Sequence, residues 1–245
     1  GDLQAQCTAS SYAMRELGVP FAGLFGACST MAEGLALGAA LCEGGAARNL
    51  LAMASSHFCA AERQFRTPLS YGAVRTPTAQ WTATAAGCCL LQPQGEGVGI
   101  AAATFGRVQD YQVKDINNMG AAMAPAAAST LLHYFKDTGT EPQEFDCIYT
   151  GDLGQVGSQL LRELLAAEGL LIKNHVDCGC ILFDAKEQSV KSGGSGPGCC
   201  AAVLCGHILP RLRRGSQKRV LFTATGALMS QTTFLQKESI PAVAH

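Results

Sequence analysis

Short apolar runs alternate along the chain with longer, helix-favouring segments. The runs predict strands at 49–54, 84–91, 98–105, 145–150, 178–184 and 219–225, and the segments between them predict helices at 9–17, 29–43, 121–136, 156–168 and 198–209. Strands separated by helices are typical of α/β domains with mostly parallel sheets. We therefore predict an α/β fold.

Two of the predicted helices, 29–43 and 198–209, are apolar on nearly every face and rich in alanine, glycine and cysteine. A helix that is apolar all round is buried on all sides. Two such helices need sheets both above and below them. The pattern therefore predicts a layered αβαβα arrangement with these helices in the middle layer.

The chain also contains a weak internal repeat. GDLQAQ begins at Gly1 and GDLGQVG at Gly151, and an apolar helix and strand follow each copy. We predict two similar α/β halves, 1–105 and 106–245. A helix and a strand precede Gly151 but not Gly1, so we expect the first half to lack its opening strand and helix.

The composition argues against two classes of protein, nucleic-acid binders and membrane-spanning proteins. The 245 residues carry a formal net charge of −1, which does not provide the basic face that nucleic-acid binding requires, so we expect no nucleic-acid partner. Acidic residues interrupt the richest apolar segment, so we predict neither a transmembrane helix nor a signal peptide, and we expect a soluble protein.

The twelve cysteines lie mostly among apolar neighbours, which favours reduced, buried thiols. The spacings around Cys178, Cys180, Cys199 and Cys200 do not match the paired ligands of zinc ribbons. We predict no metal site and no cofactor.

Cys28 stands at the start of helix 29–43, where the helix dipole and free amides lower the pKa of a thiol and can stabilise an oxyanion. Among the five histidines, His57 follows strand 49–54 and is the best candidate for a base. A Cys28/His57 pair is therefore the enzymatic interpretation of the sequence.

Several blocks point to a known family: GDLQAQ, FGACSTMAEG, SSHFCAAERQFRTPLSYG, NNMGAAMAPAAAST, HYFKDTG, TGDLGQVG, GGSGPGCC and ATGALMS with ESIPAVAH. With these blocks in order, the chain resembles the thiolase superfamily and, more narrowly, the stage V sporulation protein AD family of endospore-forming bacteria. The resemblance covers essentially the whole chain except the family's N-terminal segment.

This resemblance implies a thiolase-like fold and a homodimer. It also implies binding of dipicolinic acid (pyridine-2,6-dicarboxylate), which the family helps to move into the developing spore with membrane proteins of the same operon. The expected location is the cytoplasmic face, peripheral to the spore inner membrane. The basic run 210–219 is either a solvated helix end or a docking site for that membrane.

The resemblance also implies that the catalytic triad is broken. Active members of the superfamily pair the cysteine with a histidine in one loop and an asparagine or histidine in another. Here the corresponding loops hold Asp152 and Ser195. A carboxylate is a poor base at neutral pH and repels a thiolate. Two alternatives remain: an acyltransferase or ketoacyl synthase that uses Cys28, and a scaffold for a membrane channel.

Two glycine-rich turns, Gly26–Ser29 and Gly193–Cys199, lead into the buried helices, and helix N-termini bind anions. The predicted ligand-binding residues are Asp2, Cys28, Ser29, His57, Arg66, Asp152, Ser195 and Gly196. Arg66 lies in a charged loop that also holds Arg63 and Arg75. If this loop does not bind the ligand, we expect it to be a solvated surface loop or a dimer contact. Asp2 and Asp152 either cap the helices that follow them or coordinate calcium carried with the dicarboxylate.

Overall fold

The computed structural model describes residues 4–65, 74–184 and 186–245. Its elements are α1 (Gln4–Leu17), η1 (Ala27–Ser29), α2 (Thr30–Glu43), β1 (Leu50–Ser56), α3 (Phe58–Phe65), β2 (Trp81–Thr82), β3 (Ala85–Leu91), α4 (Met119–Thr138), η3 (Pro142–Glu144), β4 (Cys147–Gly151), α5 (Gly154–Ala167), β5 (His175–Asp177), α6 (Cys178–Leu182), β6 (Gly194–Ser195), α7 (Pro197–Val203), the π-helix η4 (Leu204–Ile208), α8 (Leu209–Arg213), β7 (Val220–Ala227), α9 (Gln231–Leu235) and β8 (Ala242–Ala244).

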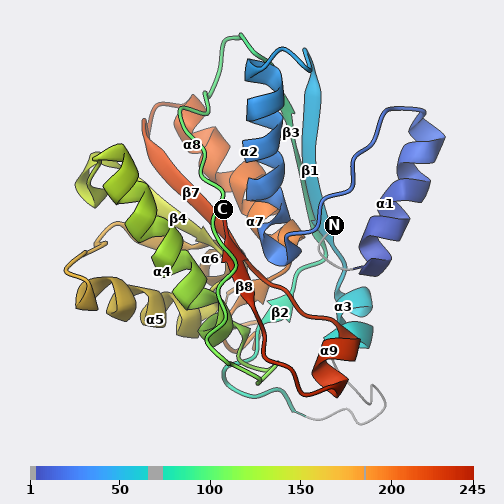
Figure 1. The fold of residues 1–245 in the computed structure, drawn as a ribbon, viewed down its shortest axis with the longest axis vertical. Helices are drawn as coiled ribbons and strands as arrows, with labels where there is room; N and C mark the ends of the chain where they lie inside the picture. Colours follow the sequence, from blue (N-terminus) through green and yellow to red (C-terminus); the bar gives the residue numbers. More distant parts are fainter. Residues whose placement is uncertain (1–3, 66–73, 185) are drawn as a thin grey trace.

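The elements form layers (Figure 1). Helices α4 and α5 cover one face of a four-stranded sheet in the order β5-β4-β7-β8. Helices α2 and α7 lie on the other face of that sheet and also contact the β1–β3 sheet. The two apolar helices therefore form a middle layer, as their sequences predict.

The two larger sheets differ in direction. β4 pairs in parallel with β5 and β7, while β8 is antiparallel to β7. β1 and β3 pair antiparallel over their whole length. The prediction of mostly parallel sheets is therefore correct for the centre of the larger sheet and wrong for β1 and β3.

Two apolar clusters make the core. One lies between α4, α5 and the larger sheet and combines the alanines of α4 with larger side chains such as Leu131, Ile148 and Leu161. The other fills the middle layer and includes Met31, Tyr149, Cys147, Cys178 and Cys200. These three cysteines are buried and carry free thiols, as predicted, whereas Cys59 and Cys88 are exposed, so the prediction of buried thiols does not hold for every cysteine.

Two predicted strands are wrong. Segment 98–105 forms no strand and lies largely at the surface, and its larger apolar residues, Val98, Ile100 and Phe105, are exposed rather than buried in a sheet. Segment 178–184 begins instead with helix α6, because the side chain of Asp177 accepts a hydrogen bond from Gly179 N and caps the helix. The helix predicted at 198–209 is present, but a π-helical stretch divides it into α7 and α8.

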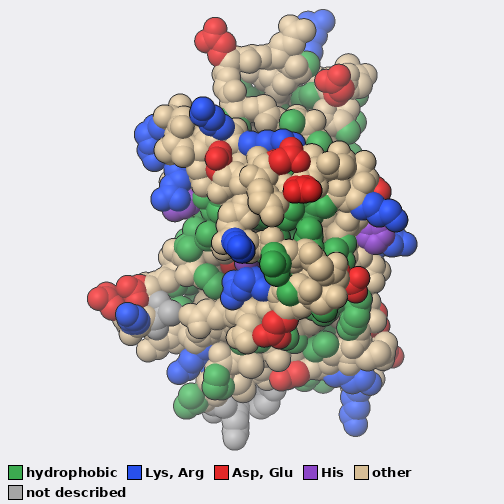
Figure 2. All heavy atoms as spheres, turned by 90° about the vertical axis from the view of Figure 1, so that its left-hand side faces the viewer, with side chains coloured by type: hydrophobic (Ala, Val, Ile, Leu, Met, Phe, Trp, Pro, Cys, Tyr) green, Lys and Arg blue, Asp and Glu red, His purple; other side chains and the backbone are tan. Residues whose placement is uncertain are grey.

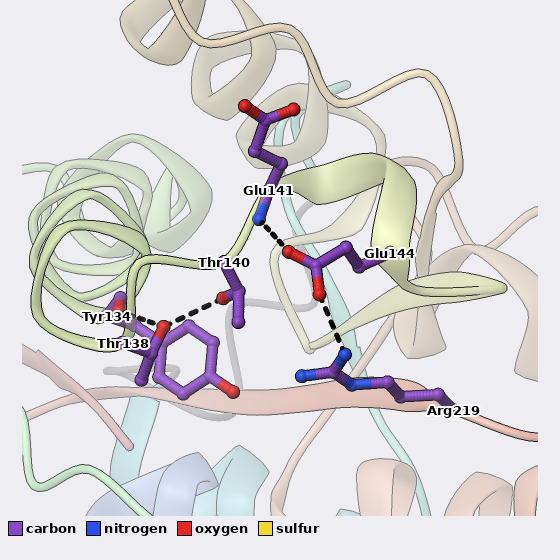
Figure 3. Close-up of polar contacts among 6 residues, drawn as sticks. All are labelled: Tyr134, Thr138, Thr140, Glu141, Glu144 and Arg219. Atoms are coloured by element: carbon purple, nitrogen blue, oxygen red, sulfur yellow. Dashed lines mark hydrogen bonds and ion pairs between the residues drawn. The ribbon is translucent and has the colours of Figure 1, made fainter.

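The turn before β4 is held by side chains (Figure 3). The hydroxyls of Thr138 and Thr140 lie 2.7 Å apart, and Glu141 N donates to Glu144 Oε1 over 2.8 Å. Arg219 Nη1 forms an ion pair of 2.9 Å with Glu144 Oε2. The contact ties η3 to the beginning of β7.

Charged side chains of both signs occur in several separate groups on the face shown in Figure 2. This face does not carry the single broad basic surface of a nucleic-acid binder. Among the described helices, none combines the length and the apolar character needed to cross a membrane.

Candidate functional site

Cys28 lies in a tight turn that leads into α2. Ala27 adopts a left-handed conformation (φ 50°), which is strained for a residue with a Cβ. Two hydroxyls within the turn hold it: Ser29 Oγ donates to Gly26 O (2.6 Å) and Thr30 Oγ1 donates to Ala27 O (2.7 Å). The turn is thus stabilised from within, and Ser29 has a structural role in it.

The sulfur of Cys28 faces a hydroxyl. Its Sγ lies 3.5 Å from Ser195 Oγ, and both residues are only 7% exposed. The backbone carbonyl of Cys28 also accepts a hydrogen bond of 3.4 Å from Cys200 Sγ. A serine hydroxyl has too little basicity to take a thiol proton at neutral pH. The structure therefore brings together Cys28 and Ser195, two residues that the sequence placed in one site.

Ser56, which is distant in the sequence, caps the N-terminus of α7. Gly196 has φ 98°, and a side chain on it would meet Ser56. Ser56 Oγ accepts from Gly198 N (3.0 Å) and donates to Ala83 O (2.7 Å), while Cys199 N donates to Gly196 O (2.8 Å). These two amides of the predicted anion site already have protein acceptors. Gly196 makes the close approach of β1 possible.

Asp152 is fully buried in the turn between β4 and α5, also with a left-handed backbone (φ 70°). The buried carboxylate of Asp177 holds this turn, and sequence reasoning missed it. It accepts from Thr150 Oγ1 (2.7 Å), Leu153 N (3.0 Å), Gly154 N (2.9 Å) and Gly179 N (2.9 Å). Ser192 O then accepts from the next amide, Gln155 N (2.7 Å). The amides at the start of α5 are therefore bound by the protein itself.

Burial shifts the ionisation of the groups around this turn. Burial first, and then the charge of nearby carboxylates, raise the pKa of the Cys178, Cys199 and Cys200 thiols well above its usual value. These thiols are protonated at neutral pH. They are packing groups with weak S–H donors rather than nucleophiles.

A histidine also belongs to the Asp177 network. His175 Nε2 lies 2.8 Å from Thr150 Oγ1. Burial, assisted by the charge of Arg162, lowers the pKa of His175 to about 4, while burial raises the pKa of Asp177 to about 6 against the hydrogen bonds that lower it. His175 is neutral at physiological pH, and its role in this network is structural.

The end of β7 joins the Cys28 turn to the Asp152 turn. Thr225 Oγ1 donates to Gly151 O over 2.6 Å. The next residue, Gly226, is packed so closely on Gly26 O that an added Cβ would clash with it. Each turn therefore contacts one of two adjacent residues at the end of β7.

The remaining predicted residues are less centrally placed. His57 is exposed and follows β1 directly, next to the Ser56 that caps α7. Asp2 and Arg66 lie outside the described residues. From the same charged loop, the guanidinium of Arg75 lies 4.5 Å from the ring centre of Trp81 and donates to Gln80 O over 3.0 Å.

Sequence reasoning also missed Ser56 and Gln80, which link these loops. An aspartate directly before a helix was a usable signal for Asp177, whereas nothing local distinguishes Ser56 or Gln80. Within the described residues, no three His, Cys, Asp or Glu side chains gather as metal ligands.

Comparison with known proteins identifies relatives. The sequence model of the Stage V sporulation protein AD family matches residues 1–245. Stage V sporulation protein AD of Bacillus subtilis (strain 168) is 43% identical over 246 residues, an alignment that covers 100% of this chain and 72% of the relative.

Solved structures agree on the fold. The 3-oxoacyl-[acyl-carrier-protein] synthase III of Aquifex aeolicus VF5 matches 97% of this chain and 70% of its own, with a TM-score of 0.51 and 12% identity. The synthase III of Pseudomonas aeruginosa PAO1 matches 90% and 66%, with a TM-score of 0.50 and 13% identity. At such low identity the likeness shows a thiolase-like fold and nothing about activity.

Proposed function

Because the chain belongs to the stage V sporulation protein AD family, we propose that it binds dipicolinic acid without transforming it and serves its uptake into the developing spore. The observation that carries this proposal is the pairing of Cys28 with Ser195. The condensing reaction of the thiolase fold needs a base beside the sulfur, and a serine hydroxyl does not supply one.

In this proposal the ligand lies at the meeting point of the Cys28 turn and the β6–α7 loop. One carboxylate is placed at the start of α2 beside Cys28 and Ser29, where the helix dipole favours an anion. Ser29 N and Ser29 Oγ both donate to Gly26 O, so the attraction at this end comes from the dipole rather than from these two donors. The second carboxylate reaches the β6–α7 loop at Ser195 and Gly196. His57, Asp2 and Arg66 complete the proposed set.

Calcium gives Asp152 a role in the same proposal. A buried carboxylate near the ligand repels a dianion, whereas a calcium ion carried with dipicolinate offsets that repulsion. The site is proposed to accept the ligand with or without the cation.

Calorimetry tests the binding. Titration with dipicolinate is expected to release or absorb heat that saturates at one ligand per chain. Pyridine-2-carboxylate serves as the control, because it lacks one of the two carboxylates, and it is expected to bind at least tenfold more weakly. Ser195→Ala is expected to weaken dipicolinate several-fold through the loss of one hydrogen bond. Absence of heat at millimolar dipicolinate contradicts the proposal and leaves the scaffold alternative.

The enzymatic alternative has its own readout. Incubation with acyl-CoA followed by intact-mass measurement is expected to give no adduct. A stable acyl adduct that disappears in Cys28→Ala would show a working nucleophile, with His57 as the candidate base. That result would replace the binding proposal with an acyltransferase or ketoacyl synthase.

The proposal extends to the cell. The chain is proposed to act as a homodimer at the cytoplasmic face, peripherally associated with the spore inner membrane and with membrane proteins of the same sporulation operon. Sedimentation is expected to give the mass of a dimer. A monomeric mass at micromolar concentration would contradict that part.

A further inference from the structure

Gln80 lies just before β2 and connects the two loops that flank the proposed site. Its Nε2 donates to Asp152 O over 2.6 Å and to Gly194 O over 3.0 Å. Asp152 belongs to the β4–α5 turn, and Gly194 directly precedes Ser195. One primary amide therefore joins loops that are more than forty residues apart in the sequence.

The backbone of Gln80 is itself fixed. Its carbonyl accepts from Arg75 Nη1, whose guanidinium lies over the ring of Trp81. Trp81 N in turn donates to Gly193 O over 2.8 Å, and Trp81 pairs with Gly194 in the β2–β6 ladder. These contacts hold the backbone of Gln80 in place. Its side chain therefore fixes the distance between the carbonyl oxygens of Asp152 and Gly194.

The oxygen of the same side-chain amide destabilises the fold. Gln80 Oε1 is buried and accepts no hydrogen bond from the described residues. A buried carbonyl oxygen without a donor lowers stability. Within the described residues, the favourable contacts of this side-chain amide are therefore those of Nε2.

We propose that Gln80 is a positioning residue: its Nε2 clamp sets the distance between the Asp152 turn and Ser195, and through Ser195 it sets the surroundings of the Cys28 sulfur. The effect on the sulfur is independent of any ligand. The effect on dipicolinate affinity rests on the proposed function.

The chain offers a matched control at the opposite end of β4. Asn174 Nδ2 also bridges two backbone carbonyls, Pro142 O (3.0 Å) and Phe145 O (2.6 Å). Gln80→Met and Asn174→Leu each remove one bridging amide and leave the volume of the side chain nearly unchanged. Both are expected to lower the melting temperature, so this measurement does not separate them.

The deciding measurement is the rate of Cys28 alkylation by iodoacetamide under native conditions, followed by mass spectrometry of the Cys28 peptide. The exposed Cys88 serves as an internal reference. Gln80→Met is expected to raise the Cys28 rate at least fivefold relative to Cys88, and Asn174→Leu to leave it within a factor of two. Gln80→Glu, which keeps the shape but as a carboxylate cannot donate, is expected to behave like Gln80→Met.

Dipicolinate affinity is the second readout. If the wild type binds, Gln80→Met is expected to lose at least tenfold in affinity and Asn174→Leu less than twofold. Equal Cys28 alkylation in the Gln80 and Asn174 variants overturns the positioning role, whether or not dipicolinate binds. A wild type that gives no binding heat, together with the predicted alkylation difference, upholds the positioning role and defeats the proposed function alone.

Discussion

The Cys28 turn and the Asp152 turn both contain strained backbone, but different kinds of contact stabilise it in each turn. Each contains a buried residue with a left-handed backbone, Ala27 in one and Asp152 in the other, and each leads toward a helix. The Cys28 turn is held by the hydroxyls of its own residues, Ser29 and Thr30. The Asp152 turn is held from outside, by Asp177 and by Gln80.

The Asp152 turn therefore depends on the rest of the fold more than the Cys28 turn does. Strained backbone persists only where its surroundings over-determine it. The hydrogen bonds that hold the Cys28 turn come from Ser29, the last residue of η1, and Thr30, the first residue of α2. The Asp152 turn instead needs a strand, a helix end and a distant loop in place. Substitutions in the distant residues should therefore damage the second turn first.

The largest expected effect comes from Asp177→Ala. The change leaves three backbone amides and one hydroxyl without their acceptor in a buried position, so we expect a loss of about 3–5 kcal/mol in the free energy of unfolding. Urea denaturation measures it. Asp146→Ala is the control, because its exposed carboxylate also accepts from two backbone amides, those of Lys218 and Arg219, and water can replace it, so this variant should lose far less stability. Equal losses in the two variants would mean that burial of the acceptor does not matter.

The next largest effect tests the Cys28 turn through its close contact with β7. Gly226→Ala places a methyl group against Gly26 O, so the turn must shift, and we expect a loss of about 2–3 kcal/mol by denaturation. Gly206→Ala, whose added Cβ would meet nothing within 4 Å, is expected to be neutral or slightly stabilising. A tolerated Gly226→Ala would show that the turn adjusts freely.

The smallest expected effect concerns pH and the Asp177 network. The pKa of His175 is lowered to about 4 from 6.5, so its contribution to stability is complete above pH 6.5 and is lost as the pH falls toward 4. The pKa of Asp177 is raised to about 6, so stability from that group increases as the pH falls below 6. The two trends oppose each other in the wild type.

His175→Gln removes one of these trends and keeps a hydrogen-bonding side chain beside Thr150. Relative to the wild type, the variant is expected to gain on the order of 2 kcal/mol in unfolding free energy between pH 6.5 and pH 4, measured by urea denaturation at each pH. Parallel pH curves for the two proteins would show that the histidine does not titrate as its burial implies.

Much of the architecture could be predicted from the sequence. Helices that are apolar on all faces, such as 29–43, belong in a middle layer whatever surrounds them, and the structure places them there. The motifs around Cys28 and Ser195 also predicted that these two residues lie close together, and their side chains are 3.5 Å apart.

The parts that failed depend on long-range partners. A run such as 178–184 has the composition of a strand, but the cap from Asp177 turns its first residues into a helix. The antiparallel pairing of β1 with β3 is decided by the path of the chain between them, which apolar patterning does not record. The roles of Ser56 and Gln80 come from carbonyls and amides that become neighbours only after folding.

The most direct test of non-covalent dipicolinate binding is a crystal structure of the protein soaked with dipicolinate. We predict ligand density between the Cys28 turn and the β6–α7 loop, with one carboxylate near the Cys28 sulfur and the other near Ser195, and no covalent bond to the sulfur. Density at an unrelated surface, or a histidine ring that reaches the sulfur beside an open acyl tunnel, would contradict it.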